Sequence, residues 1–155
     1  EDLYRRGLYT FIRRTSPPPS MMAFDATSRE VCTIKRQTTS TPLQALVLLN
    51  DPQFFEASRV FAQRILLEAG KTIEEQIDYG FRLATSRHPE KEEVEILKEM
   101  YSSQLKYYKS NPSEAYKLVN VGETPYNRGL SLSKTAAMTL VANTLLNHNE
   151  TYTKR

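Results

Sequence analysis

The clearest apolar pattern in the chain is a leucine-rich run that follows Thr41. Thr41 is a suitable N-cap, Pro42 suits the first helical position, and Gln44 completes a capping box. The residues from Leu43 to Leu49 leave almost no polar face, so we predict a short helix that is buried on most sides. We expect this helix to be the hub around which the other helices pack.

After this run, apolar residues recur at helical spacing and are interrupted by proline, glycine and capping residues. These signals predict further helices that begin at Pro52, Thr72, Pro89, Pro112 and near Ser133. In the last helix, small residues should let a neighbouring helix approach closely; they are Ala136, Ala137 and Ala142. The other predicted core positions are Phe54, Phe55, Phe61, Ala62, Ile65, Leu66, Ile73, Ile77, Phe81, Ala84, Val94, Leu97, Tyr101, Leu105, Tyr108, Leu140, Val141, Leu145 and Leu146.

The first forty residues lack helical spacing. The prolines between Thr15 and Ser20 predict a polyproline II segment, and the apolar residues that follow it should dock on the helices. Glu30 to Lys35 alternates in the manner of a short strand. We therefore predict a mainly α fold: a compact bundle of about five or six helices. An irregular segment, 1–40, should wrap over the helical body, 41–155, with room for one short β-hairpin.

The length of 155 residues suits a single domain with a substantial core. The longest apolar run is far shorter than the roughly 18 residues that a membrane span requires, so we expect no span. The first residues contain no signal peptide and the chain starts with Glu1, so we expect a fragment of a larger protein. Cys32, the single cysteine, excludes an internal disulfide.

The net charge of +3 comes from the N-terminal segment. Residues 1–40 hold seven basic and four acidic side chains, whereas the rest of the chain is balanced. Attraction for a polyanion would therefore originate here, but the excess is small for a nucleic-acid-binding protein. We expect no nucleic-acid partner.

Few residues suggest chemistry. His88 and His148 lack metal-ligand spacing and are better explained as residues at helix ends. Cys32 could be a reactive thiol near basic residues, although a small buried apolar role is commoner for a lone cysteine. Asp25 and Glu30 could form a carboxylate pair, or bind neighbouring arginines.

The basic residues Arg29, Lys35 and Arg36, with Asp25 beside them in sequence, are the candidate contacts for an anion or a partner. The alternative is that these side chains pair with acidic helices or remain solvated. We predict no catalytic residue, no metal ligand and no cofactor on this chain.

The order of motifs resembles that of the planctomycete PSD-one family, a domain of unknown function. The resemblance covers nearly the whole chain. It is carried by Arg5-Arg6-Gly7-Leu8-Tyr9-Thr10-Phe11, Arg14-Thr15, Pro17-Pro18-Pro19-Ser20-Met21, Phe24-Asp25-Ala26, Arg29-Glu30-Val31-Cys32, Arg36-Gln37, the run from Thr41 to Phe54, and the ending from Leu145 to Arg155.

The resemblance implies a secreted or cell-envelope setting. It also implies a place at the C-terminal end of a large protein, often behind a cytochrome c-like haem domain and another domain. The family supplies no active site, and the haem motif C-x-x-C-H is absent from this sequence.

Three functions follow as hypotheses. The first is a non-catalytic accessory or interaction module that contacts upstream domains of the same polypeptide. The second is a module that binds an anion or a polysaccharide through its basic N-terminal segment. The third is part of an enzyme whose site, around Asp25 and Cys32, is completed by an upstream domain.

Overall fold

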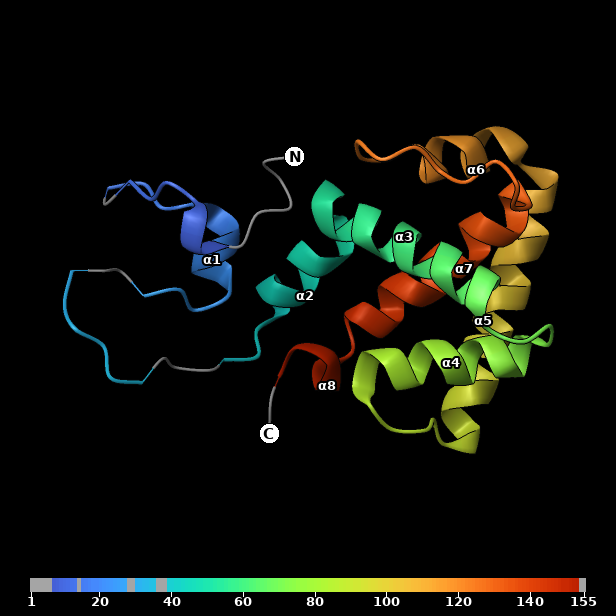
Figure 1. Cartoon of the computed structure of the whole chain (residues 1–155), viewed down its shortest axis with the longest axis horizontal. Helices are drawn as coiled ribbons and strands as arrows, with labels where there is room; N and C mark the ends of the chain where they lie inside the picture. The colour runs from blue at the N-terminus through green and yellow to red at the C-terminus, as the bar shows by residue number, and fades with distance from the viewer. Residues whose placement is uncertain (1–6, 14, 28–29, 36–38, 154–155) are drawn as a thin grey trace.

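The computed structural model describes residues 7–13, 15–27, 30–35 and 39–153. These residues form a mainly helical structure, as predicted, with six helices of eight residues or more (Figure 1). The elements are η2 (Gly7–Tyr9), α1 (Pro19–Ala23), α2 (Pro42–Asn50), α3 (Pro52–Glu68), α4 (Ile73–Thr85), α5 (Lys91–Ser110), α6 (Pro112–Val119), α7 (Leu132–Leu146) and α8 (Asn149–Tyr152). None of the described helices is both long and apolar enough to cross a bilayer.

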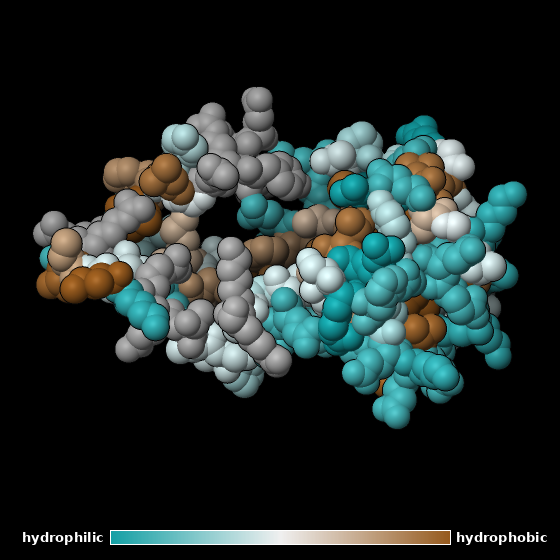
Figure 2. Space-filling model, turned by 60° about the horizontal axis from the view of Figure 1, so that its bottom comes forward, coloured by the Kyte–Doolittle hydropathy of each residue, from teal (hydrophilic) through white to brown (hydrophobic). Residues whose placement is uncertain are grey.

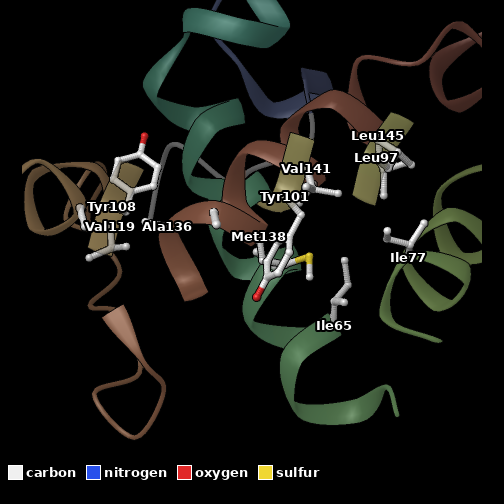
Figure 3. Packing of buried hydrophobic residues seen from close by; sticks show 14 of the residues in the cluster. Ile65, Ile77, Leu97, Tyr101, Tyr108, Val119, Ala136, Met138, Val141 and Leu145 are labelled. Atoms are coloured by element: carbon white, nitrogen blue, oxygen red, sulfur yellow. The ribbon is translucent and has the colours of Figure 1, made fainter. Parts of the chain in front are cut away.

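Helix α7 lies at the centre of the bundle and packs chiefly against α3, α5 and α6 (Figure 1). Its sequence has no broad polar face, and buried residues lie around most of the helix. In Figure 3, Met138 of α7 lies near Ile65 and Tyr101, while Leu145 lies near Leu97. The hydrophobic core is therefore one cluster, and α7 runs through its centre.

Small side chains explain how α7 accommodates so many neighbours. Ala136, Ala137 and Ala142 have no exposed surface, which confirms their predicted role in close helix packing. Two threonines are buried on the same helix without loss of hydrogen bonding. Thr135 donates to the carbonyl of Ser131, and Thr139 donates to the carbonyl of Thr135.

The prediction that α2 is the buried hub is wrong. The predicted capping box is present, but Leu43, Leu46 and Leu49 are 57%, 56% and 42% exposed. Only Gln44 and Leu48 of this helix are buried. The helix lies at the edge of the bundle, where one side meets its neighbours and the opposite side meets solvent (Figure 1).

Several other boundaries also differ from those predicted. Pro18 has the extended conformation expected of polyproline II, but α1 begins at Pro19, because proline is compatible with the first helical turn. The described residues 30–35 form no strand, so the predicted hairpin is wrong. Val31 and Ile34 are 72% and 104% exposed and have no packed sheet face to stabilise a strand.

The described part of the N-terminal segment lies beside α2, at one end of the bundle (Figure 1). Phe24 makes the predicted docking contact, since its ring lies 6.1 Å from that of Phe54 on α3. The wrapping of residues 1–40 over the whole body stays a prediction. Helix α8, which follows the last predicted element, was not foreseen.

The contrast between α7 and α2 can be tested by matched leucine truncations. Leu145→Ala should lower the free energy of unfolding by about 2–5 kcal/mol, because the side chain is 2% exposed and its loss leaves a cavity. Leu46→Ala should change it by about 0.5 kcal/mol or less, as for other exposed positions. Urea denaturation measures both. An equal decrease in the free energy of unfolding in the two variants would contradict the central position of α7 and favour α2 as the hub.

Candidate functional site

The structure presents an exposed apolar surface on α2, which we name the leucine face: Leu43, Leu46 and Leu49. It lies opposite the buried side that carries Gln44 and Leu48, because successive helical residues are rotated by about 100°. Exposed leucines are common one at a time, but three along one side of a short helix form a continuous strip. The leucine face is therefore the first candidate for a contact surface.

The leucine face continues into a cleft of about 450 Å³. Leu49 borders both surfaces, and Tyr107, half exposed on α5, lies on the other side of the cleft. The lining also includes Phe55, Leu118 and Val121. Such a cleft could accept a large apolar side chain from a partner that lies along α2.

A second cleft, of about 460 Å³, separates the N-terminal segment from α3. Its lining is mostly apolar and consists of Gly7, Leu8, Ile12, Ser20, Met21, Phe24, Ala26, Thr27 and Phe54. Neither Asp25 nor Cys32 is among these residues. Figure 2 shows apolar surface on this end of the molecule and along its middle.

Asp25, a predicted contact residue, is engaged within the chain. Its carboxylate accepts hydrogen bonds from the backbone N–H of Thr39 at 2.9 Å and from the Thr39 hydroxyl at 2.7 Å. Its backbone has φ 55°, a left-handed conformation that aspartate tolerates better than most residues. Asp25 thus joins the end of α1 to the approach to α2.

Gln44 completes this junction although it is only 2% exposed. Its side-chain amide donates to the carbonyl of Ala23 at 2.9 Å and to the hydroxyl of Thr39 at 3.2 Å. Its amide oxygen accepts from the backbone N–H of Thr41 at 3.1 Å, as the capping box requires. Gln44 therefore both completes the capping box of α2 and holds the N-terminal segment.

The other predicted contact residues are only partly described. Lys35 is exposed, whereas Arg29 and Arg36 lie outside the described residues. Cys32 is exposed, so its predicted burial as a small apolar residue is wrong. Its apolar neighbours Val31 and Ile34 are exposed as well.

The two histidines occupy different environments. His88 is exposed, with its Nδ1 2.7 Å from a carboxylate oxygen of Asp78. His148 lies between α7 and α8, with its ring 5.9 Å from that of Phe81. Among the described residues, no group of three or more histidine, cysteine, aspartate or glutamate side chains is arranged to hold a metal ion.

Sequence reasoning missed a buried ionic pair on α3. Glu56 and Arg59 are 1% and 0% exposed, and their side chains lie 3.4 Å apart. Glu56 accepts hydrogen bonds from the backbone N–H groups of Glu123 and Thr124 at 2.9 and 2.6 Å. Arg59 donates to the carbonyl of Thr124 at 2.5 Å. The pair fixes the loop between α6 and α7 on α3.

A sequence signal for this contact did exist. Glu56, Arg59 and Gln63 follow one another at intervals of three and four residues, so they share one side of the helix. Gln63 accepts a hydrogen bond from the backbone N–H of Asn127 in the same loop. Because buried polar groups need hydrogen-bond partners, a polar stripe next to the apolar side of a helix favours a loop that covers it.

Sequence reasoning also missed an ionic cluster around Arg87. Its guanidinium donates two hydrogen bonds to Glu93, at 2.9 and 2.7 Å, and one to Glu150 at 2.7 Å. It also lies 4.7 Å from the centre of the Phe81 ring. The hydrogen bonds from Arg87 are the main reason that the pKa of Glu93 falls to about 2. The same bonds raise the pKa of Arg87.

The family model for PSD1, described as a protein of unknown function (DUF1553), matches residues 1–101. The chain belongs to the PSD1 family. No curated protein and no solved structure matches it.

The stretch that matches the PSD1 model includes the leucine face, the Asp25–Gln44 junction, the Glu56–Arg59 pair and Arg87. It ends at Tyr101, within α5, so α7 lies beyond it. The resemblance of the C-terminal ending to the family is outside the matched residues and stays a prediction.

The Glu56 contact predicts an unusual sensitivity at Gly122. This residue has φ 95°, and a Cβ atom there would lie 2.0 Å from a carboxylate oxygen of Glu56. Gly122→Ala should therefore lower the free energy of unfolding by about 1–3 kcal/mol. Gly129→Ala, in the same loop, meets only the Asn127 side chain at 3.1 Å and should cost less. Equal losses in thermal or urea unfolding would contradict the proposed role of Glu56.

The Arg87 cluster predicts a pH dependence. The pKa of Glu93 in the folded chain, about 2, is below its usual value of 4.5. Ionised Glu93 therefore stabilises the fold above pH 4.5, and this contribution is lost as the pH falls toward 2. Glu93→Gln should reduce the difference in unfolding midpoint between neutral and acidic pH. The exposed control Glu95→Gln should leave it unchanged, and a similar response in both variants would contradict the assignment.

Proposed function

We propose that this PSD1 chain is a non-catalytic interaction module of a larger secreted or cell-envelope bacterial protein, and that the leucine face of α2 is its contact surface. The observation that carries the proposal is the exposure of Leu43, Leu46 and Leu49 on the side of α2 opposite its buried residues. Full burial of an exposed leucine side chain is worth about 1.5–3 kcal/mol, and these three are about half exposed, so coverage by a partner would recover part of that for each.

The partner that we propose is an upstream part of the same polypeptide. An intramolecular partner suits a modest apolar strip, because a covalent link supplies a high effective concentration and little interface area is needed. The cleft beside Leu49 offers a place for one anchoring side chain, with Phe55 and Tyr107 as its walls.

The interaction module is favoured over an enzyme centred on Asp25 and Cys32 by the contacts of Asp25. Its carboxylate is bonded to Thr39 and lies within 3.5 Å of the Gln44 amide, so it acts in local structure. The alternative is a module that binds anions. Of its candidate contacts Arg29, Lys35 and Arg36, only Lys35 lies within the described residues. Heparin retention that falls with Lys35→Ala would support that alternative in place of the leucine face.

The leucine face can be tested by thiol labelling in a Cys32→Ser background. Leu46→Cys should react rapidly with a maleimide in the isolated chain, because the position is 56% exposed. In the protein expressed from its complete gene, the reaction should be slower by about tenfold or more if a partner covers α2.

The matched control is Ile96→Cys, another exposed apolar position, on α5. It should react at the same rate in the chain and in the complete protein. Equal labelling of Leu46→Cys in both forms would rule out the leucine face as an intramolecular contact surface.

A further inference from the structure

We propose that α8 is a C-terminal clasp that holds the N-terminal segment against the helical bundle and keeps the cleft between them formed. The inference goes beyond the proposed contact surface on α2 and does not depend on it. It rests on the contacts that α8 makes with Arg87 at one residue and with Phe24 at another.

The clasp is fixed to the bundle at two points. Arg87, which follows α4, donates to Glu150 of α8 at 2.7 Å. Arg87 is itself held by two hydrogen bonds from its guanidinium to Glu93 near the start of α5. The hydroxyl of Thr151 donates to the carbonyl of Leu145, at the end of α7, at 2.7 Å. These contacts orient a helix that is too short to be stable by itself.

The other end of the clasp reaches the N-terminal segment. The Tyr152 ring meets the Phe24 ring edge to face, with centres 6.5 Å apart. Phe24 also contacts Phe54 of α3, so its ring has one aromatic neighbour on α3 and one on α8. Edge-to-face aromatic pairs are favourable beyond the area that they bury.

The N-terminal segment depends on such contacts because its described residues have no core of their own. Between residues 7 and 40, none of the described side chains is fully buried. The described part of the segment meets the bundle where α1 packs on α2, where Gln44 donates to the carbonyl of Ala23, and at the ring of Phe24. Loss of the contact with Tyr152 should therefore loosen the segment without unfolding the bundle.

The same contacts shape the cleft of about 460 Å³, since Phe24 and Phe54 are two of its walls. When α8 releases Phe24, this wall can move and the cleft opens. Both carboxylates of the Arg87 cluster are about one-quarter to one-third exposed, so salt should weaken the attachment of α8. The clasp thus couples the ionic cluster on one side of α8 to the apolar cleft on its other side.

Amide hydrogen exchange tests the clasp. The N–H of Ala26 donates to the carbonyl of Met21 at 2.9 Å and reports on the segment, whereas amides within α7 report on the bundle. Tyr152→Ala should speed exchange at Ala26 about three- to tenfold, the loss expected for one aromatic pair, and leave α7 unchanged. Tyr152→Phe keeps the ring and should behave as the unmodified chain.

Two further variants separate the clasp from a general loss of stability. Glu150→Gln removes the ion pair between α8 and Arg87 and should also speed exchange at Ala26, with less effect at high salt. Tyr116→Ala removes an exposed tyrosine from α6 and should change neither region. Unchanged exchange at Ala26 in both Tyr152→Ala and Glu150→Gln would overturn the proposal, as would equal acceleration in α7.

Discussion

The packing of α7 through the bundle is the interaction on which the rest of the structure depends. Its buried alanines let neighbouring helices approach closely, while Met138 lies near Ile65 and Tyr101 and Leu145 lies near Leu97 (Figure 3). A helix with this arrangement contributes to the core around most of its surface, so the surrounding helices need only one apolar side each. This explains why α4 and α5 keep strongly polar outer faces.

Buried polar contacts then fix the parts of the chain that are not helical. Glu56 and Arg59 hold the loop before α7 through its backbone, and Gln44 holds the segment after α1. Asn143 on α7 plays a related part, since its amide donates to Ser58 of α3 at 3.2 Å and to the carbonyl of Leu48 at 3.4 Å. Each contact satisfies a polar group that would otherwise be costly to bury.

These contacts leave two apolar surfaces at one end of the molecule: the leucine face of α2 and the cleft beside the N-terminal segment. Both lie within the residues that match the PSD1 family. The proposed interaction module and the proposed clasp depend on different features of this end of the molecule. The first needs an exposed strip on a rigid helix, and the second needs a segment attached by few contacts. The structure contains both features. The leucine face is on the side of α2 opposite Gln44, and the N-terminal segment is attached where Gln44 donates to Ala23.

The sequence by itself determined the helical class, most helix starts and the small-residue face of α7, because capping, proline position and apolar spacing act over a few neighbouring residues. It also determined the membership of the PSD1 family. Only the tertiary structure decided which apolar helix is central. The leucine run of α2 is more uniformly apolar than the sequence around it, yet the neighbouring helices cover only one side of α2. Helix α7, in contrast, is buried over most of its surface. The partners of Glu56, Arg87 and Tyr152 were decided in the same way. The polar stripe on α3 signals that Glu56 needs a partner, but neighbouring residues in the sequence do not specify which distant residue supplies it.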